Sequence, residues 1–198
     1  MDYSLALDIA ENIKAQLEPA CNRVEIKGSL ARKKPNVNDI DIMVELNGRR
    51  PRLEFRMKAS DAPRTELDVI LQGMTGEGTL RFLEGGDRLK KFVISMGTLN
   101  PIRLELYICQ PPAQWGVISV IRTGSEEFSK WMVSSRNRGG ALPPQYCCMD
   151  GAIRKLTKIE ECLPMPEERD FFAFCDMEWI SPESRQPRWG QFDKKAKR

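Results

Sequence analysis

The sequence predicts an α+β protein, with strands through the middle of the chain and helices before and after them. The first 17 residues carry an apolar side chain at every fourth position, which is typical of an amphipathic helix. Residues 39–44 and 102–109 alternate in polarity, as half-buried strands do. The 198 residues, 41% hydrophobic and 30% charged, suffice for one large domain, or a domain and a half, with a buried core.

The first helix has four apolar side chains spaced i, i+4, and Pro19 closes it. These side chains are Leu5, Ile9, Ile13 and Leu17. The next elements, in order, are a short strand (24–26) that runs into Gly28-Ser29, a basic loop (31–38) and a strand (39–44).

Residues 60–71 predict a second helix, with Ser60 or Asp61 as its cap and Pro63 in its first turn. The elements that follow are a loop (73–78), a hairpin (79–83 and 88–96) and a strand (102–109) that Pro111-Pro112 ends.

The C-terminal part begins with residues 116–121, whose apolar and β-branched side chains predict a strand. Ser125 begins a helix that extends to about Arg136, with acidic side chains in its first turn. The remaining elements are a hairpin (146–148 and 152–156) with a type I′ turn, a last helix (166 to about 174) and a basic tail. A shift in composition near residues 112–125 predicts a second subdomain.

The composition excludes several kinds of chemistry. The chain has no histidine, which rules out a Ser-His-Asp triad, a Cys-His dyad and a histidine-ligated zinc. A catalyst must therefore use carboxylates, thiols, hydroxyls or bound metal ions. The net charge is only +3, but basic residues gather at 23–34, 49–58 and 185–198, which indicates either phosphate contacts or a solvated surface.

The six cysteines include no CxxC pair, and Cys147 and Cys148 are adjacent, which suits neither a zinc knuckle nor a disulfide framework. We therefore expect core thiols. The sequence contains neither a signal peptide nor an apolar run of about 18 residues. We accordingly expect a reducing, cytoplasmic compartment and no membrane partner.

Asp39 and Asp41 form the main candidate site. On a strand they point to one face, about 7 Å apart, while Ile40 and Ile42 point to the other. Carboxylates this close repel each other, and Mg²⁺, which prefers hard oxygen ligands and substrate phosphates, relieves the repulsion. Taken alone, an exposed strand face explains such a pair more often than a metal does.

Three further features favour a site for metal and phosphate. Gly28-Ser29, at the end of a strand, offers backbone N–H groups and a hydroxyl to phosphate oxygens. The loop that follows carries Arg32 and two lysines as counter-charges for a triphosphate. Glu105, on a later strand with the same alternation, offers a third carboxylate.

Gly28-Ser29 followed by Asp39-x-Asp41 resembles the G-S-x(n)-D-x-D signature of the nucleotidyltransferase superfamily, and more narrowly that of family X DNA polymerases. The segment Arg103-x-Glu105 is similar to the strand of that family that bears the third carboxylate, normally R-x-D.

The C-terminal half extends the resemblance to about residues 3–186. Thr123-Gly124-Ser125, followed by Phe128, is similar to the T-G-S-x-x-F turn after the palm. The closing segment, in which an aromatic residue precedes P-x-x-R, is matched by Phe171, Trp179, Pro182 and Arg185.

The resemblance implies a domain layout. We expect a nucleotidyltransferase palm over residues 1–111, with a mixed or antiparallel sheet and flanking helices. A small α/β C-terminal subdomain over residues 112–186 and a basic tail over residues 187–198 would follow it. We expect a minimal form, without the lyase domain and helix-hairpin-helix region that usually precede the palm. The sequence gives no sign of oligomerisation, so we expect a monomer.

The resemblance also implies a reaction, two-metal phosphoryl transfer that adds a deoxynucleotide to a primer 3′-hydroxyl and releases pyrophosphate. Asp39 and Asp41 would hold two Mg²⁺ ions, for which Mn²⁺ could substitute, and Glu105 would hold the ion that activates the hydroxyl. The residues implied in nucleotide binding are Gly28, Ser29, Arg32, Asn38, Ile121, Arg122, Gly124, Ser125 and Ser129.

The expected partners are a deoxynucleoside triphosphate and a primer-template or gapped DNA, as in the filling of short gaps during DNA repair. DNA contacts should go mostly to phosphates, although each basic side chain could equally be a solvated charge. The candidates for these contacts are Arg103, Lys130, Arg136, Arg138 and Arg185.

Several positions depart from the family. Glu105 stands where Asp is usual, and Ile121-Arg122 replaces an aromatic pair that contacts the nucleotide sugar. Two alternatives stay open: a template-independent or small-molecule nucleotidyltransferase, many of which use a glutamate third ligand, and a DNA-binding palm without turnover. The T-G-S turn and the closing segment favour the polymerase.

Overall fold

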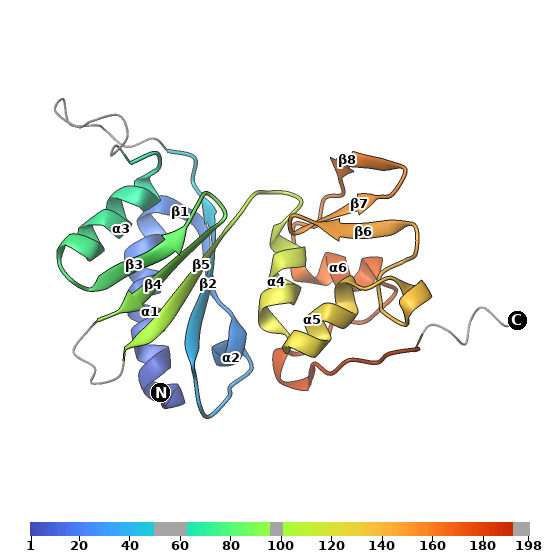
Figure 1. Ribbon diagram of the computed structural model, residues 1–198, viewed down its shortest axis with the longest axis horizontal. Coiled ribbons are helices and arrows are strands. Elements are labelled where there is room, and N and C mark those ends of the chain that lie inside the picture. Colours follow the sequence, from blue (N-terminus) through green and yellow to red (C-terminus); the bar gives the residue numbers. More distant parts are fainter. Residues whose placement is uncertain (50–62, 96–100, 192–198) are drawn as a thin grey trace, which may run out of the picture. The chain divides into compact units, whose positions relative to one another are not determined.

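The computed structural model describes residues 1–49, 63–95 and 101–191 of the chain (Figure 1). They form two compact units: the first comprises residues 1–30 and 34–108, and the second comprises residues 31–33 and the chain from 109 onward. The division after residue 108 lies close to the boundary that the sequence predicts after residue 111. Helices and strands occur in both units, which confirms the α+β fold class.

The first unit is built on a mixed five-stranded sheet with the order β1-β2-β5-β4-β3. Its elements are α1 (Tyr3–Leu17), a 3₁₀ turn (Glu18–Ala20), β1 (Cys21–Ile26), α2 (Gly28–Ala31), β2 (Asp39–Leu46), α3 (Glu66–Gly76), β3 (Leu80–Gly85), β4 (Leu89–Ile94) and β5 (Ile102–Cys109). The first helix, the strand after the basic loop, the hairpin and the strand at 102–109 are therefore confirmed.

One face of this sheet carries the hydrophobic core. Ile40 and Ile42 of β2 and Leu104 and Leu106 of β5 are fully buried in the same cluster as the apolar side of α1 and α3. In Figure 1, α1 passes behind the strands. Because side chains alternate along a strand, the residues between these core positions point to the opposite face. Neither α1 nor α3 covers this face, which we call the open face, although Met43 and Tyr107 on it are buried.

Helix α3 begins later than the sequence predicts. The hydroxyl of Thr65 accepts a hydrogen bond from the backbone N–H of Asp68, whose carboxylate accepts one from the N–H of Thr65, so a capping box sets the start. The expected caps, Ser60 and Asp61, lie outside the described residues. The helix continues to Gly76, through the first part of the expected loop.

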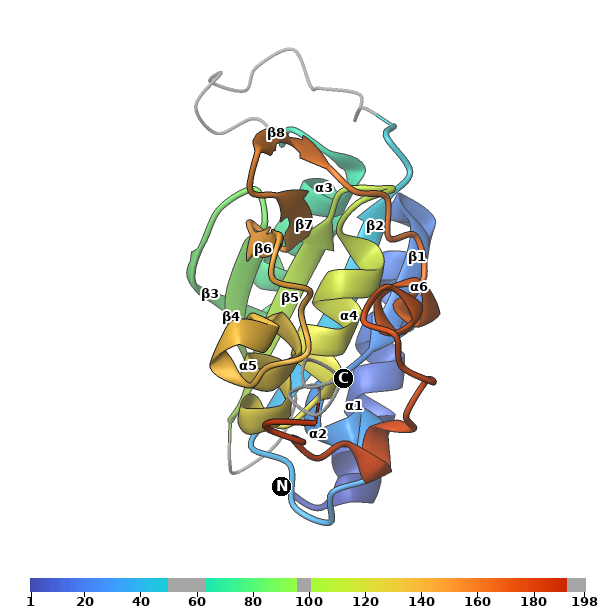
Figure 2. The same cartoon turned by 90° about the vertical axis from the view of Figure 1, so that its right-hand side faces the viewer.

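The second unit packs α4 against α5 and α6, beside a three-stranded antiparallel sheet (Figure 2). Its elements are α4 (Trp115–Thr123), α5 (Glu126–Val133), a 3₁₀ turn (Arg136–Arg138), β6 (Tyr146–Met149), β7 (Ala152–Lys155), β8 (Lys158–Cys162), α6 (Glu168–Phe174) and a 3₁₀ turn (Pro182–Ser184). Aromatic side chains from α5 and α6, among them Phe128, Trp131 and Phe172, form its core.

The strand expected over residues 116–121 is wrong, because these residues belong to α4. Val117 and Val120 are buried in the core of the second unit. Gly116 lets the helix approach the segment before α6: its N–H donates to the carbonyl of Met165 at 2.8 Å, and a Cβ would lie 2.2 Å from the carbonyl oxygen of Glu167. Its valines and isoleucines favour a strand by propensity, and this local preference explains the wrong prediction.

The hairpin of the second unit is confirmed together with its turn. Asp150 and Gly151 have φ values of 54° and 71°, as a type I′ turn requires. Strand β8, which the sequence does not predict, has only exposed residues and therefore no alternation of buried and exposed positions. Within the described ranges of the chain, no helix combines the length and apolarity needed to cross a membrane.

The cysteines are all free thiols. Cys109 and Cys175 are buried, as expected of core thiols, whereas Cys162 on β8 is exposed. Burial raises the pKa of Cys175 from its ordinary value of 9.0 to about 12. The pKa of Cys148 rises for the same reason to about 11.

Cys175 should make stability depend on pH in the alkaline range. Its contribution is complete below pH 9.0 and is lost as the pH rises towards about 12, because the unfolded thiol ionises first. The free energy of unfolding should fall by about 1.4 kcal/mol for each pH unit in that interval. Urea unfolding across this range should give a shallower slope for Cys175→Ala and the wild-type slope for Cys162→Ala; equal slopes in all three proteins would contradict the prediction.

Candidate functional site

The two carboxylates of β2 share the open face of the first unit. Asp39 and Asp41 are half-buried, and they alternate with Ile40 and Ile42, which lie in the core. Asp39 and Asp41 therefore lie on one face of the strand, opposite Ile40 and Ile42, as the sequence predicts.

Gly28 brings the turn after β1 against Asp41. Its φ is +65°, and a Cβ at this position would lie 1.9 Å from Oδ2 of Asp41. The N–H of Lys27 donates to the carbonyl of Asp41 at 2.8 Å, which fixes the same approach through the backbone. Only glycine leaves room for the carboxylate here, so the predicted association of Gly28-Ser29 with the Asp39-x-Asp41 strand is present in the fold.

Ser29 carries an unsatisfied hydroxyl beside this turn. Its Oγ is buried, and within the described part of the chain it has no hydrogen-bond partner. The carbonyl of Ser29 accepts from the N–H of Lys34 at 3.0 Å, which closes the basic loop onto the turn. A buried hydroxyl without a partner costs free energy unless a ligand supplies one, and a phosphate oxygen can do so.

Glu105 lies on β5, the neighbour of β2 in the sheet, and alternation places it on the open face as well. The hydroxyl of Tyr107 donates to its Oε2. Across the strand pair, Nζ of Lys91 lies 4.0 Å from Oε1 of Glu105 and 2.8 Å from Oε1 of Glu84. The third carboxylate thus has a hydroxyl and an ammonium group beside it.

Residues 1–49, 63–95 and 101–191 contain no group of three or more His, Cys, Asp or Glu side chains that could hold a metal ion. The structure therefore places the three expected ligands on one face without gathering them around one point. Three observations nevertheless fit a metal with a bound phosphate: the hard oxygen donors, the close contact of Gly28 with Asp41, and the unsatisfied hydroxyl of Ser29. Asp39, Asp41 and Glu105 are the side chains that would hold it.

The T-G-S turn and Arg32 come together within the second unit. Nη1 of Arg32 donates to the carbonyls of Thr123 and Gly124, at 2.9 and 2.8 Å. The hydroxyl of Ser125 accepts from the N–H of Phe128 and so caps α5. These contacts give the turn a structural role in the folded chain.

The other expected nucleotide residues differ in exposure. Ser129 is buried, and its hydroxyl donates to the carbonyl of Ile121 at 2.6 Å. Asn38 and Arg122 are exposed, whereas Ile121 is half-buried.

Of the five expected DNA contacts, Arg185 needs correction and Arg136 is largely engaged within the second unit. The guanidinium of Arg136 donates to the carbonyls of Ala141 and Cys175 and to the carboxylate of Asp176. The side chain of Arg185 has no exposed surface and is paired with Glu168 at 2.8 Å. Both arginines therefore help to hold the second unit together; Arg185 offers no surface to DNA, whereas the side chain of Arg136 stays 22% exposed.

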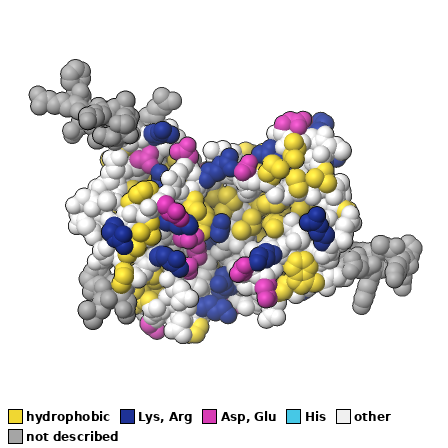
Figure 3. Space-filling view, viewed as in Figure 1, with side chains coloured by type: hydrophobic (Ala, Val, Ile, Leu, Met, Phe, Trp, Pro, Cys, Tyr) yellow, Lys and Arg dark blue, Asp and Glu magenta, His cyan; other side chains and the backbone are white. Residues whose placement is uncertain are grey.

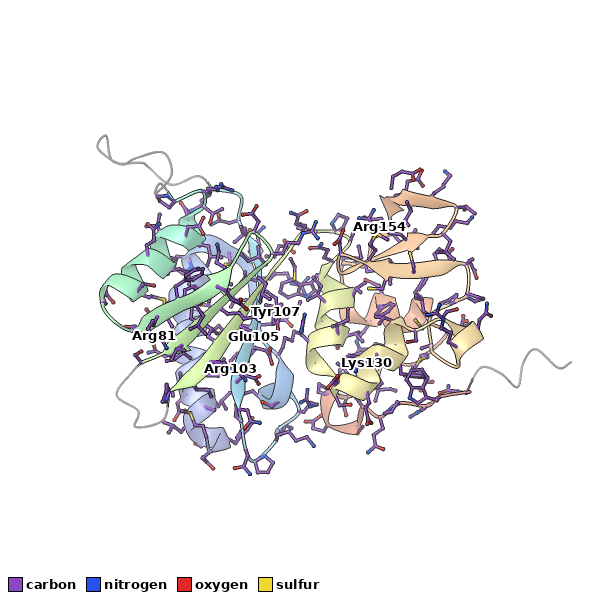
Figure 4. The ribbon with its side chains drawn as sticks, in the orientation of Figure 1. Arg81, Arg103, Glu105, Tyr107, Lys130 and Arg154 are labelled. Carbon is purple, nitrogen blue, oxygen red and sulfur yellow. The ribbon has the colours of Figure 1, made fainter. Side chains whose placement is uncertain are left out.

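The other three remain on the surface. Arg103 on β5 and Lys130 on α5 (Figure 4) are exposed, and so is Arg138. Lys130 is paired with Glu126, one turn earlier in its helix. A surface pair of this kind contributes little to stability and leaves the lysine able to exchange its partner for a phosphate.

Sequence reasoning missed Arg81 on β3. Strand register pairs Arg81 with Val93 and Val93 with Arg103, so the two arginines lie in one row across the sheet, two residues along β5 from Glu105 (Figure 4). Acidic and basic side chains are intermingled on the visible face of the first unit (Figure 3). The sequence predicts the hairpin over residues 79–96 that contains Arg81. That Arg81 lies in one row with Arg103, however, follows only from the pairing of β3 with β4 and of β4 with β5.

A cavity of about 610 Å³ lies elsewhere in the first unit, between α3 and the β3–β4 hairpin. Phe82, Phe92, Asp68 and Lys90 line it, and Phe92 belongs to the core side of the sheet. Burial alone would raise the pKa of Asp68, but hydrogen bonds from Thr65 and Lys90, with the charge of Lys90, lower it below its ordinary value. This carboxylate serves the capping box and an ion pair, on the opposite side from the carboxylates of β2.

No protein-family model matches the chain, and no curated protein matches its sequence. Any function assigned to the chain must therefore come from its own residues.

Proposed function

We propose that the chain is a DNA-directed DNA polymerase of the family X type. The observation that carries the proposal is the Asp39-x-Asp41 pair on the open face, with the turn of Gly28 packed against Asp41 and the hydroxyl of Ser29 unsatisfied beside it. This combination offers oxygen ligands for metal ions next to a donor for a phosphate oxygen.

In the proposed reaction, Asp39 and Asp41 of β2 and Glu105 of β5 would hold two Mg²⁺ ions. When bound, the ions would supply the positive charge for activation of a primer 3′-hydroxyl and for stabilisation of the departing pyrophosphate. Ser29 donates its hydroxyl to the triphosphate, and the glycine before it keeps the backbone close to the carboxylates. No histidine takes part, in agreement with the composition.

DNA would be held through its phosphates. Arg103 on β5, the strand that carries Glu105, and Arg81 on β3 lie in one row across the sheet, which suits a sugar-phosphate backbone that passes the carboxylates. Contacts to phosphates do not distinguish one DNA sequence from another. The incoming nucleotide would therefore be selected by pairing with the template base. The six free cysteines support a reducing, cytoplasmic compartment for this activity.

Primer extension on a one-nucleotide gap tests the proposal. With Mg²⁺ present, the purified chain should add the nucleotide complementary to the template base and release pyrophosphate, and the preference should change with each of the four template bases. Addition that ignores the template would indicate a terminal transferase. Tight DNA binding without any metal-dependent pyrophosphate release would instead indicate a palm without turnover.

A further inference from the structure

We propose that Tyr107 is a positioning residue for Glu105, and that it makes glutamate the correct length for the third carboxylate of this chain. The inference rests on the proposed function, because it concerns the side chain expected to bind the metal that activates the primer. It adds a residue that neither the resemblance nor the carboxylate pattern points to.

The geometry of β5 supports this role. Tyr107 follows Glu105 by two residues, so the two side chains leave the strand on the same face. The tyrosine is only 4% exposed, and pairing of its backbone with Leu89 of β4 fixes its position in the sheet. Its hydroxyl donates to Oε2 of Glu105, so a held phenol ring determines where that oxygen lies.

The second oxygen of the same carboxylate stays available. Lys91 stands directly opposite Glu105 in the sheet, with its Nζ 4.0 Å from Oε1, but its closer partner is Glu84, at 2.8 Å. A carboxylate can accept about four hydrogen bonds or metal contacts, so the bond from Tyr107 to one oxygen leaves the other able to bind a metal ion. Lys91 can then remain with Glu84.

The hydrogen bond from Tyr107 gives a physical reason for the length of the Glu105 side chain. An aspartate at position 105 would be shorter by one methylene, about 1.5 Å. The ring of Tyr107 is buried and cannot follow, and a hydrogen bond stretched by that distance is lost. The departure from the usual aspartate is therefore compensated within the same strand.

Partners that orient a metal ligand typically contribute 10- to 100-fold to metal affinity or activity. Tyr107→Phe keeps the ring and removes only the hydroxyl, so it should weaken Mn²⁺ binding to the protein alone by about 10-fold or more. It should lower primer extension by a similar factor. Tyr146→Phe, which removes a hydroxyl from β6 in the second unit, is the matched control and should change neither quantity.

A double-mutant cycle with Glu105→Asp separates positioning from general packing. Mn²⁺ binding is measured by electron paramagnetic resonance without DNA, extension is measured on gapped DNA, and thermal unfolding checks the fold. Glu105→Asp should lower both Mn²⁺ affinity and primer extension by about 10-fold, although aspartate is usual in the family that the chain resembles. In the Glu105→Asp background, Tyr107→Phe should change either quantity by less than about twofold. Such a small effect of Tyr107→Phe in the Glu105→Asp variant is expected if Tyr107 acts through Glu105.

Two results would overturn the inference. Additive losses in the double variant would mean that Tyr107 acts through packing, and wild-type values in Tyr107→Phe would mean that it does not act on Glu105. With either result, primer extension by the wild-type protein would still support the proposed function. A wild-type protein that neither binds Mn²⁺ nor extends primers overturns both.

Discussion

Asp41→Asn should lower metal-dependent nucleotide addition by about 10³-fold or more, since each tenfold loss corresponds to about 1.4 kcal/mol and a lost metal charge costs several. The amide is nearly the same size as the carboxylate, so the contact with Gly28 survives while the negative charge disappears. Primer extension on gapped DNA, measured over a range of Mg²⁺ concentrations, is the appropriate assay.

Glu45→Gln provides the control for this loss. Glu45 lies on the same strand and, by alternation, on the same face, four residues beyond Asp41 and away from the turn of Gly28. Its neutralisation should leave extension within about twofold of wild type, because its side chain is not among the proposed metal ligands. Extension by Asp41→Asn at more than about a tenth of the wild-type rate would contradict the two-metal proposal.

Glu168→Ala should lower the free energy of unfolding by about 3–5 kcal/mol, the typical cost of breaking a buried ion pair from one side. Arg185 has no exposed side-chain surface, and its guanidinium lies 2.8 Å from Glu168 and within 5.3–6.0 Å of the rings of Phe128, Phe172 and Trp179. Loss of Glu168 leaves a buried cation without its carboxylate. Urea unfolding of the full chain measures the effect.

Glu161→Ala removes the same charge from an exposed pair and is the matched control. Glu161 lies 3.1 Å from Lys158, and both side chains are about 60% exposed. Removal of such a surface pair changes stability by at most about 1 kcal/mol. Similar losses for the two variants would show that the pair of Arg185 and Glu168 contributes no more than a surface contact.

Some elements could be predicted because their signals are local. The alternation of Asp39, Ile40, Asp41 and Ile42 has the period of a strand in any context, and it assigned each side chain to the correct face. Ser125 was placed correctly at the start of α5 because a helix cap depends on its own turn, three residues long.

Helix α4 shows where local signals fail. Its β-branched residues favour a strand by propensity, but burial against α5 and α6 decides in favour of a helix. Propensity differences amount to less than about 1 kcal/mol for each residue. Burial of a single valine contributes about 1.5–3 kcal/mol, so tertiary packing prevails.

Local periodicity is enough to place both carboxylates of β2 on one face of the strand. The partners of Arg185 and Glu105, in contrast, depend on how the chain packs. Arg185 is matched with Glu168, 17 residues away, and is withdrawn from the surface, while Glu105 is matched with Tyr107 on its own strand and Lys91 on the next. The reason is physical: periodicity repeats within a few residues, whereas an ion pair or a buried hydrogen bond depends on strand register and burial, which form only when distant segments pack together.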